Sequence, residues 1–447
     1  MFAFAARFAF AVLLVQAIAL GNARAQDWTG TVSVDSTAGY DDDIVPSTPG
    51  NEAASFVQIS PRALLRYETP RTINNVSYDV STFYYSGEGP EGSMVHTFSL
   101  QNISRLSPRA LLQVTGRGSA GAMSQLQLAN NAAENSTDLT PTNSDYVSGN
   151  FSQILRYKLD ATTTLVQRSV AARFSRYLPE NEFPGVGLLD VQISRGTQIG
   201  GSMGLQKDWR RTNGRVTLGV DRINLFIEGQ DPTTQYDFSF TARWQRRLTS
   251  AITSTITGGF TLTKIPGQKV TNPFRPSGVA ELAYFKDWGG VVAAFQHTIE
   301  PSLTTAQNTT SDEASIRTYL PVVQGSGAIP TVAFASTIGA QYGRIVNLVA
   351  TGTDPTMEQP DEWTTVFADA SLAWMARENL FVTARYAHTR QRGERIGELF
   401  AVQGYDRNVF SVTLSGSFSQ GRPQPATLRS SANDERRSTF TSQQDND

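Results

Sequence analysis

Residues 236 to 244 read Tyr-Asp-Phe-Ser-Phe-Thr-Ala-Arg-Trp. Side chains on an extended chain point alternately to its two faces. One face of this segment is therefore apolar and begins and ends in aromatics, at Tyr236 and Trp244. The other face is polar and carries charges of both signs, at Asp237 and Arg243. This pattern is typical of a strand with lipid on one side and water on the other.

The same alternation recurs along most of the chain and predicts an all-β protein, a transmembrane antiparallel up-and-down meander barrel of about 16–18 strands. Leu188–Ser194 and Ile316–Asn347 are the segments that decide between 16 and 18. The predicted strands are Trp28–Tyr40, Ser55–Glu68, Asn75–Tyr85, Val95–Arg105, Ala110–Ser119, Tyr146–Lys158, Thr163–Arg176, Gly196–Lys207, Arg215–Ile227, Tyr236–Arg247, Ser250–Thr263, Gly278–Asp287, Val291–Glu300, Ala314–Gln324, Thr331–Gln341, Thr364–Met375, Leu380–Gln391 and Asn408–Ser419.

The predicted connections alternate between short and long. Leu106–Arg109 and Leu248–Thr249 are short, whereas Ala120–Asp145 and Pro301–Glu313 are long and polar. Outer-membrane barrels have short periplasmic turns and long external loops, so the alternation favours a barrel over a sandwich. Pro61 lacks the N–H that a central strand needs, which predicts a bulge or a place near the rim.

The first residues predict export. Arg7 is followed by an apolar run from Phe8 to Leu20 that is too short to span a membrane as a helix. Ala23-Arg24-Ala25 fits a signal-peptidase site. We therefore predict a cleaved signal peptide at residues 1–25, a barrel at 26–419, and integration into the bacterial outer membrane.

The end of the chain predicts how the barrel closes. The last predicted strand carries Phe410, Val412, Leu414 and Phe418 on one face. A closing strand of this kind is expected to contact the barrel-assembly machinery. The polar residues 420–447 have too little apolar content to order themselves, so they are either a disordered periplasmic tail or a docking peptide.

Composition restricts the chemistry. The chain has no cysteine, only three histidines and a net charge of −2. These numbers exclude disulfides and thiolate metal sites, and they give no basic excess that would indicate nucleic acid. No nucleophile elbow, Walker loop, dinucleotide fingerprint or metal-ligand spacing occurs. We therefore predict no enzyme activity, catalytic residue, cofactor or metal.

Architecturally, the chain from Trp28 to Phe418 resembles Gram-negative outer-membrane β-barrels. Three passages resemble barrels of exopolysaccharide-producing systems, namely Gly39-Tyr40-Asp41-Asp42-Asp43, Ser60-Pro61-Arg62-Ala63-Leu64-Leu65 with Tyr67, and Tyr284-Phe285-Lys286-Asp287-Trp288-Gly289-Gly290. In that family the barrel is thought to be an outer-membrane portal beside a periplasmic polysaccharide-export protein, so the resemblance implies such a partner here.

If the apolar face meets lipid, the opposite face lines the lumen. This parity predicts the following lumen-lining residues: Arg62, Arg66, Glu68, Asp79, Arg117, Arg156, Lys158, Asp237, Arg243, Glu281, Asp369 and Arg385. Such charges either select the solutes that pass or pair with one another and brace the wall. Arg168 and Arg173 have opposite parity within one strand, which predicts a bulge or a rim position for one of them.

Aromatic residues cluster near the predicted strand ends. They are interpreted as membrane-interface anchors beside lipid and lipopolysaccharide, with sugar stacking as the alternative. These residues are Tyr67, Tyr157, Trp209, Tyr236, Trp244, Trp288 and Trp374. Phe83 and Phe285 have polar-face parity and are better placed for stacking on a sugar.

Three functions remain open from the sequence. The first is a channel or secretion portal, with exopolysaccharide as cargo. The second is a general diffusion porin for small solutes. The third is a non-conducting barrel that acts in adhesion or envelope structure through its surface loops.

Overall fold

The structure is a computed structural model, and it describes residues 28–42, 53–86, 93–123, 144–177, 194–227, 232–267, 270, 273–286, 288–302, 307–324, 330–346, 362–377, 379–394 and 405–420. The predicted signal peptide, and the predicted tail apart from Gln420, lie outside these residues and stay predictions.

The described residues form 18 strands, at the upper end of the predicted number. Their bounds are β1 Trp28–Asp41, β2 Ala54–Glu68, β3 Thr72–Tyr85, β4 Ser93–Arg105, β5 Ala110–Met123, β6 Ser144–Lys158, β7 Thr163–Tyr177, β8 Ser194–Asp208, β9 Thr212–Ile227, β10 Thr233–Arg247, β11 Ile252–Lys264, β12 Phe274–Lys286, β13 Gly289–Ser302, β14 Gln307–Gln324, β15 Pro330–Val346, β16 Glu362–Arg377, β17 Leu380–Glu394 and β18 Tyr405–Gln420.

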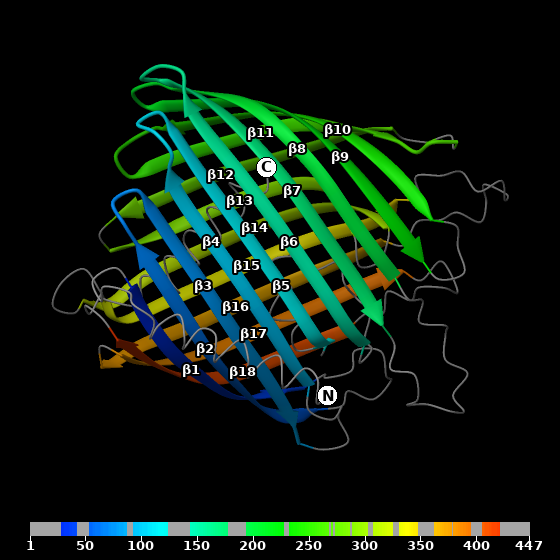
Figure 1. The fold of residues 1–447 in the computed structure, drawn as a ribbon. Helices are drawn as coiled ribbons and strands as arrows, with labels where there is room; N and C mark the ends of the chain where they lie inside the picture. The colour runs from blue at the N-terminus through cyan, green and yellow to red at the C-terminus, as the bar shows by residue number, and fades with distance from the viewer. Residues whose placement is uncertain are drawn as a thin grey trace.

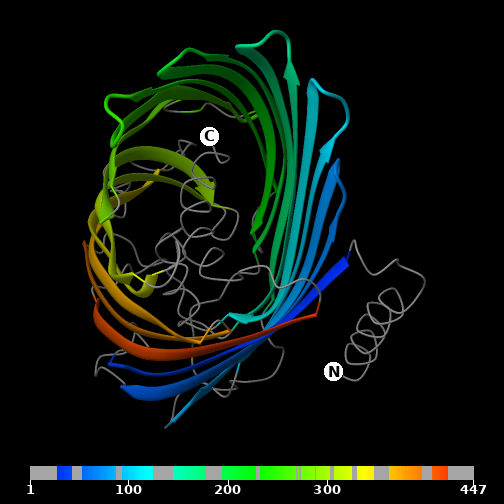
Figure 2. The same ribbon diagram turned by 90° about the vertical axis from the view of Figure 1, so that its left-hand side faces the viewer.

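Each strand pairs antiparallel with the next, and β1 also pairs with β18, so the sheet closes on itself. The strands run obliquely across the barrel in Figure 1 and follow one another around a ring in Figure 2. Closure gives every strand two neighbours and removes the unpaired edges of an open sheet. The predicted up-and-down meander barrel is confirmed. Among the described residues, no helix is long and apolar enough to cross a membrane.

Side chains alternate between the two faces of the wall as predicted. Ile199, Leu218 and Phe238 are exposed apolar side chains and share the outer face. Asp237 and Thr255 are buried on the opposite face, which lines the lumen. Outer and inner faces are thus apolar and polar respectively, the reverse of a soluble barrel.

Two local predictions are wrong. The predicted long loop Pro301–Glu313 is mostly strand, because β13 and β14 stay paired up to Ser302 and Gln307. The polar residues of this segment lack the apolar alternation that predicts a strand. Backbone hydrogen bonds alone can nevertheless extend a hairpin beyond the apolar belt.

Pro61 also departs from its prediction. It lies in the middle of β2 and pairs with Val34 without a register shift, so neither a bulge nor a rim position is present. The missing N–H falls on the β3 side, where the ladder skips from Ile59 to Arg62. The hydroxyls of Ser60 and Ser81 lie 3.0 Å apart across this gap and hydrogen-bond there.

A buried ion pair holds the seam between β1 and β18. The Arg407 guanidinium donates to both carboxylate oxygens of Asp41, and Nε lies 3.0 Å from Oδ1. One residue on, the Asn408 side chain donates to Asp42 Oδ2 at 2.6 Å. These contacts join residues from opposite ends of the chain and fix the register in which the barrel closes.

The short turn between β6 and β7 predicts a pH dependence. Asp160 Oδ1 accepts the backbone N–H groups of Thr162 at 2.7 Å and Thr163 at 2.8 Å, and the Thr162 hydroxyl at 2.9 Å. These hydrogen bonds, led by the Thr162 N–H, lower the pKa of Asp160. Because the folded pKa lies below the unfolded value of about 3.9, this contribution to stability is present above that pH and is lost as the pH falls below it.

We expect wild-type unfolding to show this acid-sensitive component, and Asp160→Asn to lack it. Unfolding midpoints measured from about pH 5 down to about pH 2 check the expectation, since Asp titrates in this range. Equal pH slopes for the two proteins would contradict the role assigned to Asp160.

Candidate functional site: the charged wall of the lumen

All the predicted lumen residues lie on strands, on the face opposite the exposed apolar side chains. The strand registers carry this parity from strand to strand, for example through the Arg62–Asp79 and Ser99–Arg117 pairs. The structure therefore places these side chains on the lumen wall. Their role in passage stays a proposal.

Several of these charges brace the wall in pairs. Arg62 Nε lies 3.1 Å from Asp79, and Arg66 Nη2 lies 2.7 Å from Glu68. Arg385 donates to Asp369 across β17 and β16. The pairs are partly exposed, so each contributes little to stability.

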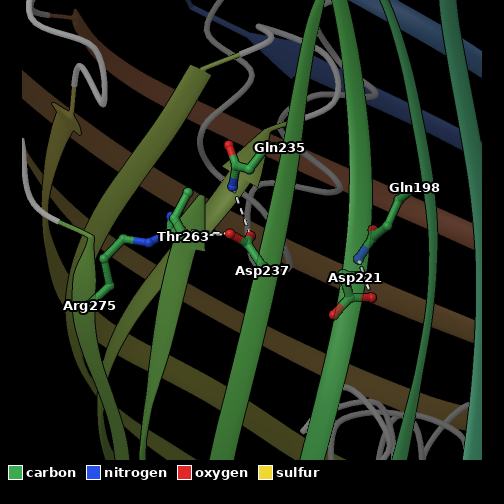
Figure 3. Close-up of polar contacts among 6 residues, drawn as sticks. All are labelled: Gln198, Asp221, Gln235, Asp237, Thr263 and Arg275. Carbon is green, nitrogen blue, oxygen red and sulfur yellow. Dashed lines mark hydrogen bonds and ion pairs between the residues drawn. The ribbon is translucent and has the colours of Figure 1, made fainter. Parts of the chain in front are cut away.

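Asp237 is the centre of a buried polar cluster on β10, β11 and β12 (Figure 3). Its Oδ1 accepts from Arg275 Nη2 at 2.9 Å and from the Thr263 hydroxyl at 2.6 Å. Its Oδ2 accepts from Gln235 Nε2 at 2.8 Å. The side chains of Arg275 and Asp237 are only 3% and 7% exposed. Asp237 therefore has a structural role, because it connects β10, β11 and β12 through its hydrogen bonds. Its parity alone suggested a charge exposed to the pore.

Sequence reasoning missed Arg275. The predicted strand began at Gly278, which left Arg275 in the connection before it. β12 begins at Phe274, and Phe274 is exposed on the outer face. Arg275 directly follows this outward-facing aromatic residue, and that alternation was the signal that could have placed Arg275 in the lumen.

Like charges lie directly opposite each other on β9 and β10. Asp221 pairs with Asp237 toward the loop ends of these strands, and Arg215 pairs with Arg243 toward the short turn. Gln198 Nε2 donates to Asp221 at 3.3 Å (Figure 3). Like charges directly opposite destabilise a sheet, so the Arg215–Arg243 pair favours a role in the lumen, whereas Asp237 is already paired with Arg275.

Basic side chains continue from Arg215 and Arg243 onto the neighbouring lumen wall. On β6 and β7, Arg156 pairs with Val166, which places Arg168 diagonally beside it. Arg117 projects from β5. We call this set the arginine arc: Arg117, Arg156, Arg168, Arg215 and Arg243. Parity from Asp221 could have identified Arg215, but sequence reasoning placed it only at a strand boundary.

The wall from β5 to β7 carries one sign of charge. None of its described lumen-facing residues is acidic. Glu281 lies on the other side of the arc, on β12, where it interacts with Arg317 and Arg243. A surface lined by one sign of charge attracts ions of the opposite sign.

The opposite parity of Arg168 and Arg173 is resolved without a bulge. β7 pairs with β6 and β8 in unbroken register, so Arg168 faces the lumen and Arg173 faces outward. Arg173 lies near the loop end of its strand. The predicted rim position is therefore correct for Arg173.

The predicted anchor aromatics lie near the two ends of the outer face or in the turns. Trp28 and Tyr67 contact each other at the short-turn end, with ring centroids 4.7 Å apart. Tyr236 lies toward the loop end. Phe83, a stacking candidate, is buried against Phe56, so packing accounts for it.

No protein-family model and no curated protein matches the sequence. Among solved structures, the chain is similar to the FrpB iron transporter from Neisseria meningitidis (F3-3 variant), with 9% identity, a TM-score of 0.50 and coverage of 87% of this chain. The F5-1 variant of FrpB in its apoprotein form gives 9% identity, a TM-score of 0.52 and 86% coverage.

This chain spans 66% of the length of either FrpB structure. The siderophore receptor PirA from Acinetobacter baumannii also matches, at 10% identity and a TM-score of 0.47, with coverage of 89% of this chain and 81% of that one. At 9% identity the likeness to FrpB shows a shared barrel fold alone.

Proposed function

We propose that the protein is an outer-membrane β-barrel conduit whose lumen favours anionic solutes. An apolar outer face and a charged inner face suit a barrel in lipid with an aqueous interior. The arginine arc is the observation that carries the preference for anions. Five guanidiniums on one wall would concentrate anions along a path through the barrel.

An acidic exopolysaccharide is the cargo that this lumen and the sequence resemblance jointly favour. Arginine binds carboxylate and phosphate groups bidentately, and a series of arginines offers a polymer successive weak sites. Conduction requires sites weak enough to leave. A periplasmic polysaccharide-export protein and the barrel-assembly machinery, the latter through β18, are the partners we propose.

Conductance measurements test the proposed preference for anions directly. Reconstituted protein in a planar bilayer under a KCl gradient is expected to give a reversal potential on the anion-selective side. Two charges 4 Å apart in water interact by about 1 kcal/mol, so removing one arginine should weaken the local attraction for an anion up to about fivefold and lower the anion-to-cation permeability ratio. We expect this shift for Arg243→Ala, and a larger one when Arg215→Ala is added.

Arg246→Ala is the matched control. Arg246 lies on the same strand as Arg243 but on its outer face, so the permeability ratio should not change. The Debye length falls from about 10 Å at 0.1 M salt to about 3 Å at 1 M, so selectivity should shrink at high salt. A folded barrel without conductance, or one whose selectivity Arg215 and Arg243 do not affect, would overturn the proposal.

Gene deletion separates export from general diffusion. Loss of surface polysaccharide with intact small-solute uptake supports export. Loss of uptake with intact polysaccharide supports a diffusion porin instead.

A further inference from the structure

Four cations face outward at the loop ends of β7 to β11. We call them the outer basic patch: Arg173, Arg195, Arg222 and Lys264. All four side chains are exposed. They lie on the opposite face of the wall from the arginine arc and have no part in the conduit proposed above.

The strand registers bring these cations together. Arg222 and Lys264 both pair with Tyr236, one from each side, which sets their Cα atoms about 10 Å apart. Arg195 pairs with Phe226, and its guanidinium carbon lies 5.9 Å from that ring centroid. Two aromatic rings thus lie among the cations, an arrangement typical of a membrane interface.

Polar side chains connect the cations across the outer face. Arg173 pairs with Thr197 and Thr197 with Asn224. Asn224 Nδ2 donates to the Thr197 hydroxyl at 3.1 Å, and Asn224 Oδ1 accepts from Arg222 Nε at 3.3 Å. A polar strip therefore extends across β7, β8 and β9 on a face that is otherwise apolar.

No outward-facing residue that the structure describes on β7 to β11 is acidic. The far side of the barrel differs. There, two outward arginines at the same end are paired with acidic residues: Arg344 Nε lies 3.6 Å from Glu362, and Arg390 Nε lies 4.0 Å from Asp406. Among the described residues of β7 to β11, no acidic one therefore balances the positive charge of the outer basic patch on this face.

An apolar surface lies directly below the patch. Ile199, Leu218 and Val220 are 64%, 63% and 46% exposed on β8 and β9. A ligand that covers both surfaces needs an anionic head and hydrocarbon chains beneath it. Arginine binds phosphate bidentately, and lysine supplies a point charge.

We infer that the outer basic patch binds the phosphorylated headgroup of an outer-leaflet glycolipid, lipopolysaccharide, with the acyl chains against β8 and β9. The inference rests on the proposed outer-membrane location, because the loop ends of the strands meet the outer leaflet only in that orientation. The lipid forms a fixed contact on one side of the barrel.

Binding of the purified full-length protein to lipid A, the phosphorylated anchor of lipopolysaccharide, tests this in mixed micelles. Each cation near a charged lipid surface contributes roughly fivefold in affinity. The double variant Arg222→Gln with Lys264→Gln should therefore bind roughly 25-fold more weakly. The control, Arg344→Gln with Glu362→Gln, removes an ion pair at the same end and face and should bind like wild type.

Three results would overturn the inference: wild-type affinity in the patch variant, equal affinity for dephosphorylated lipid A, or displacement of lipid A by millimolar inorganic phosphate. Conductance of the same preparations separates this inference from the proposed conduit. Specific lipid A binding without conductance would refute the conduit alone. Normal conductance with unchanged lipid binding by the patch variant would refute the patch alone.

Discussion

Replacing Arg275 by methionine is expected to destabilise the barrel by about 3–5 kcal/mol, the usual cost of removing one partner from a buried ion pair. The substitution leaves the Asp237 carboxylate in a site where it and its ion-pair partner are almost fully buried. Thr263 and Gln235 still donate to Asp237, but neither carries a compensating charge. Unfolding by guanidinium in phospholipid vesicles measures the loss.

Arg62→Met is the matched control. Arg62 is also a lumen arginine paired with an aspartate, but its side chain is 49% exposed, so water can replace the pair. A loss within about 1 kcal/mol is expected there. Equal losses for the two variants would show that burial does not set the strength of the Arg275–Asp237 pair.

A second variant separates an unpaired charge from lost packing. Adding Asp237→Asn to Arg275→Met removes the buried charge and should recover much of the stability, because the remaining amide can still hydrogen-bond. If the double variant is as unstable as Arg275→Met alone, packing of the arginine accounts for the effect. The conductance of both variants is expected to stay close to that of wild type, because the Arg275 and Asp237 side chains are almost fully buried.

The barrel could be predicted from the sequence because alternation is a local signal. β10 and β16 each carry several apolar residues of one parity, and the apolar period marks both the strand and the face that meets lipid. The signal ends where the apolar belt ends. The polar residues from Gln307 to Glu313 were therefore predicted as loop, although they continue β14.

The candidate site was only half predictable for a related reason. Parity places Arg156 and Arg243 in the lumen, but it does not say which charges are neutralised. Neutralisation depends on the register between strands. On β9 and β10 the register places Arg215, and not an acidic residue, opposite Arg243. Asp41 and Arg407 lie at opposite ends of the chain, and only closure of β1 on β18 brings them together.

Phe240→Arg is expected to cost roughly 2–4 kcal/mol, the range for an arginine on the lipid face near the bilayer midplane. Phe240 lies in the middle of β10 and pairs with Phe260. Their ring centroids are 5.6 Å apart, and Phe260 contacts Phe274 at 5.1 Å. An arginine would place its charge in hydrocarbon and remove one ring of this outward-facing aromatic row.

Two substitutions on the same strand distinguish face from depth. Gln245→Arg projects into the lumen, as Arg243 does, and should have little effect. Thr234→Arg lies on the outer face near the loop end, where an arginine costs only about 0–1 kcal/mol. Guanidinium unfolding in phospholipid vesicles should therefore give Phe240→Arg a clearly lower unfolding free energy than Gln245→Arg or Thr234→Arg. Similar unfolding free energies for Phe240→Arg and Gln245→Arg would mean that the exposed apolar face does not contact lipid, and the membrane assignment would fail with it.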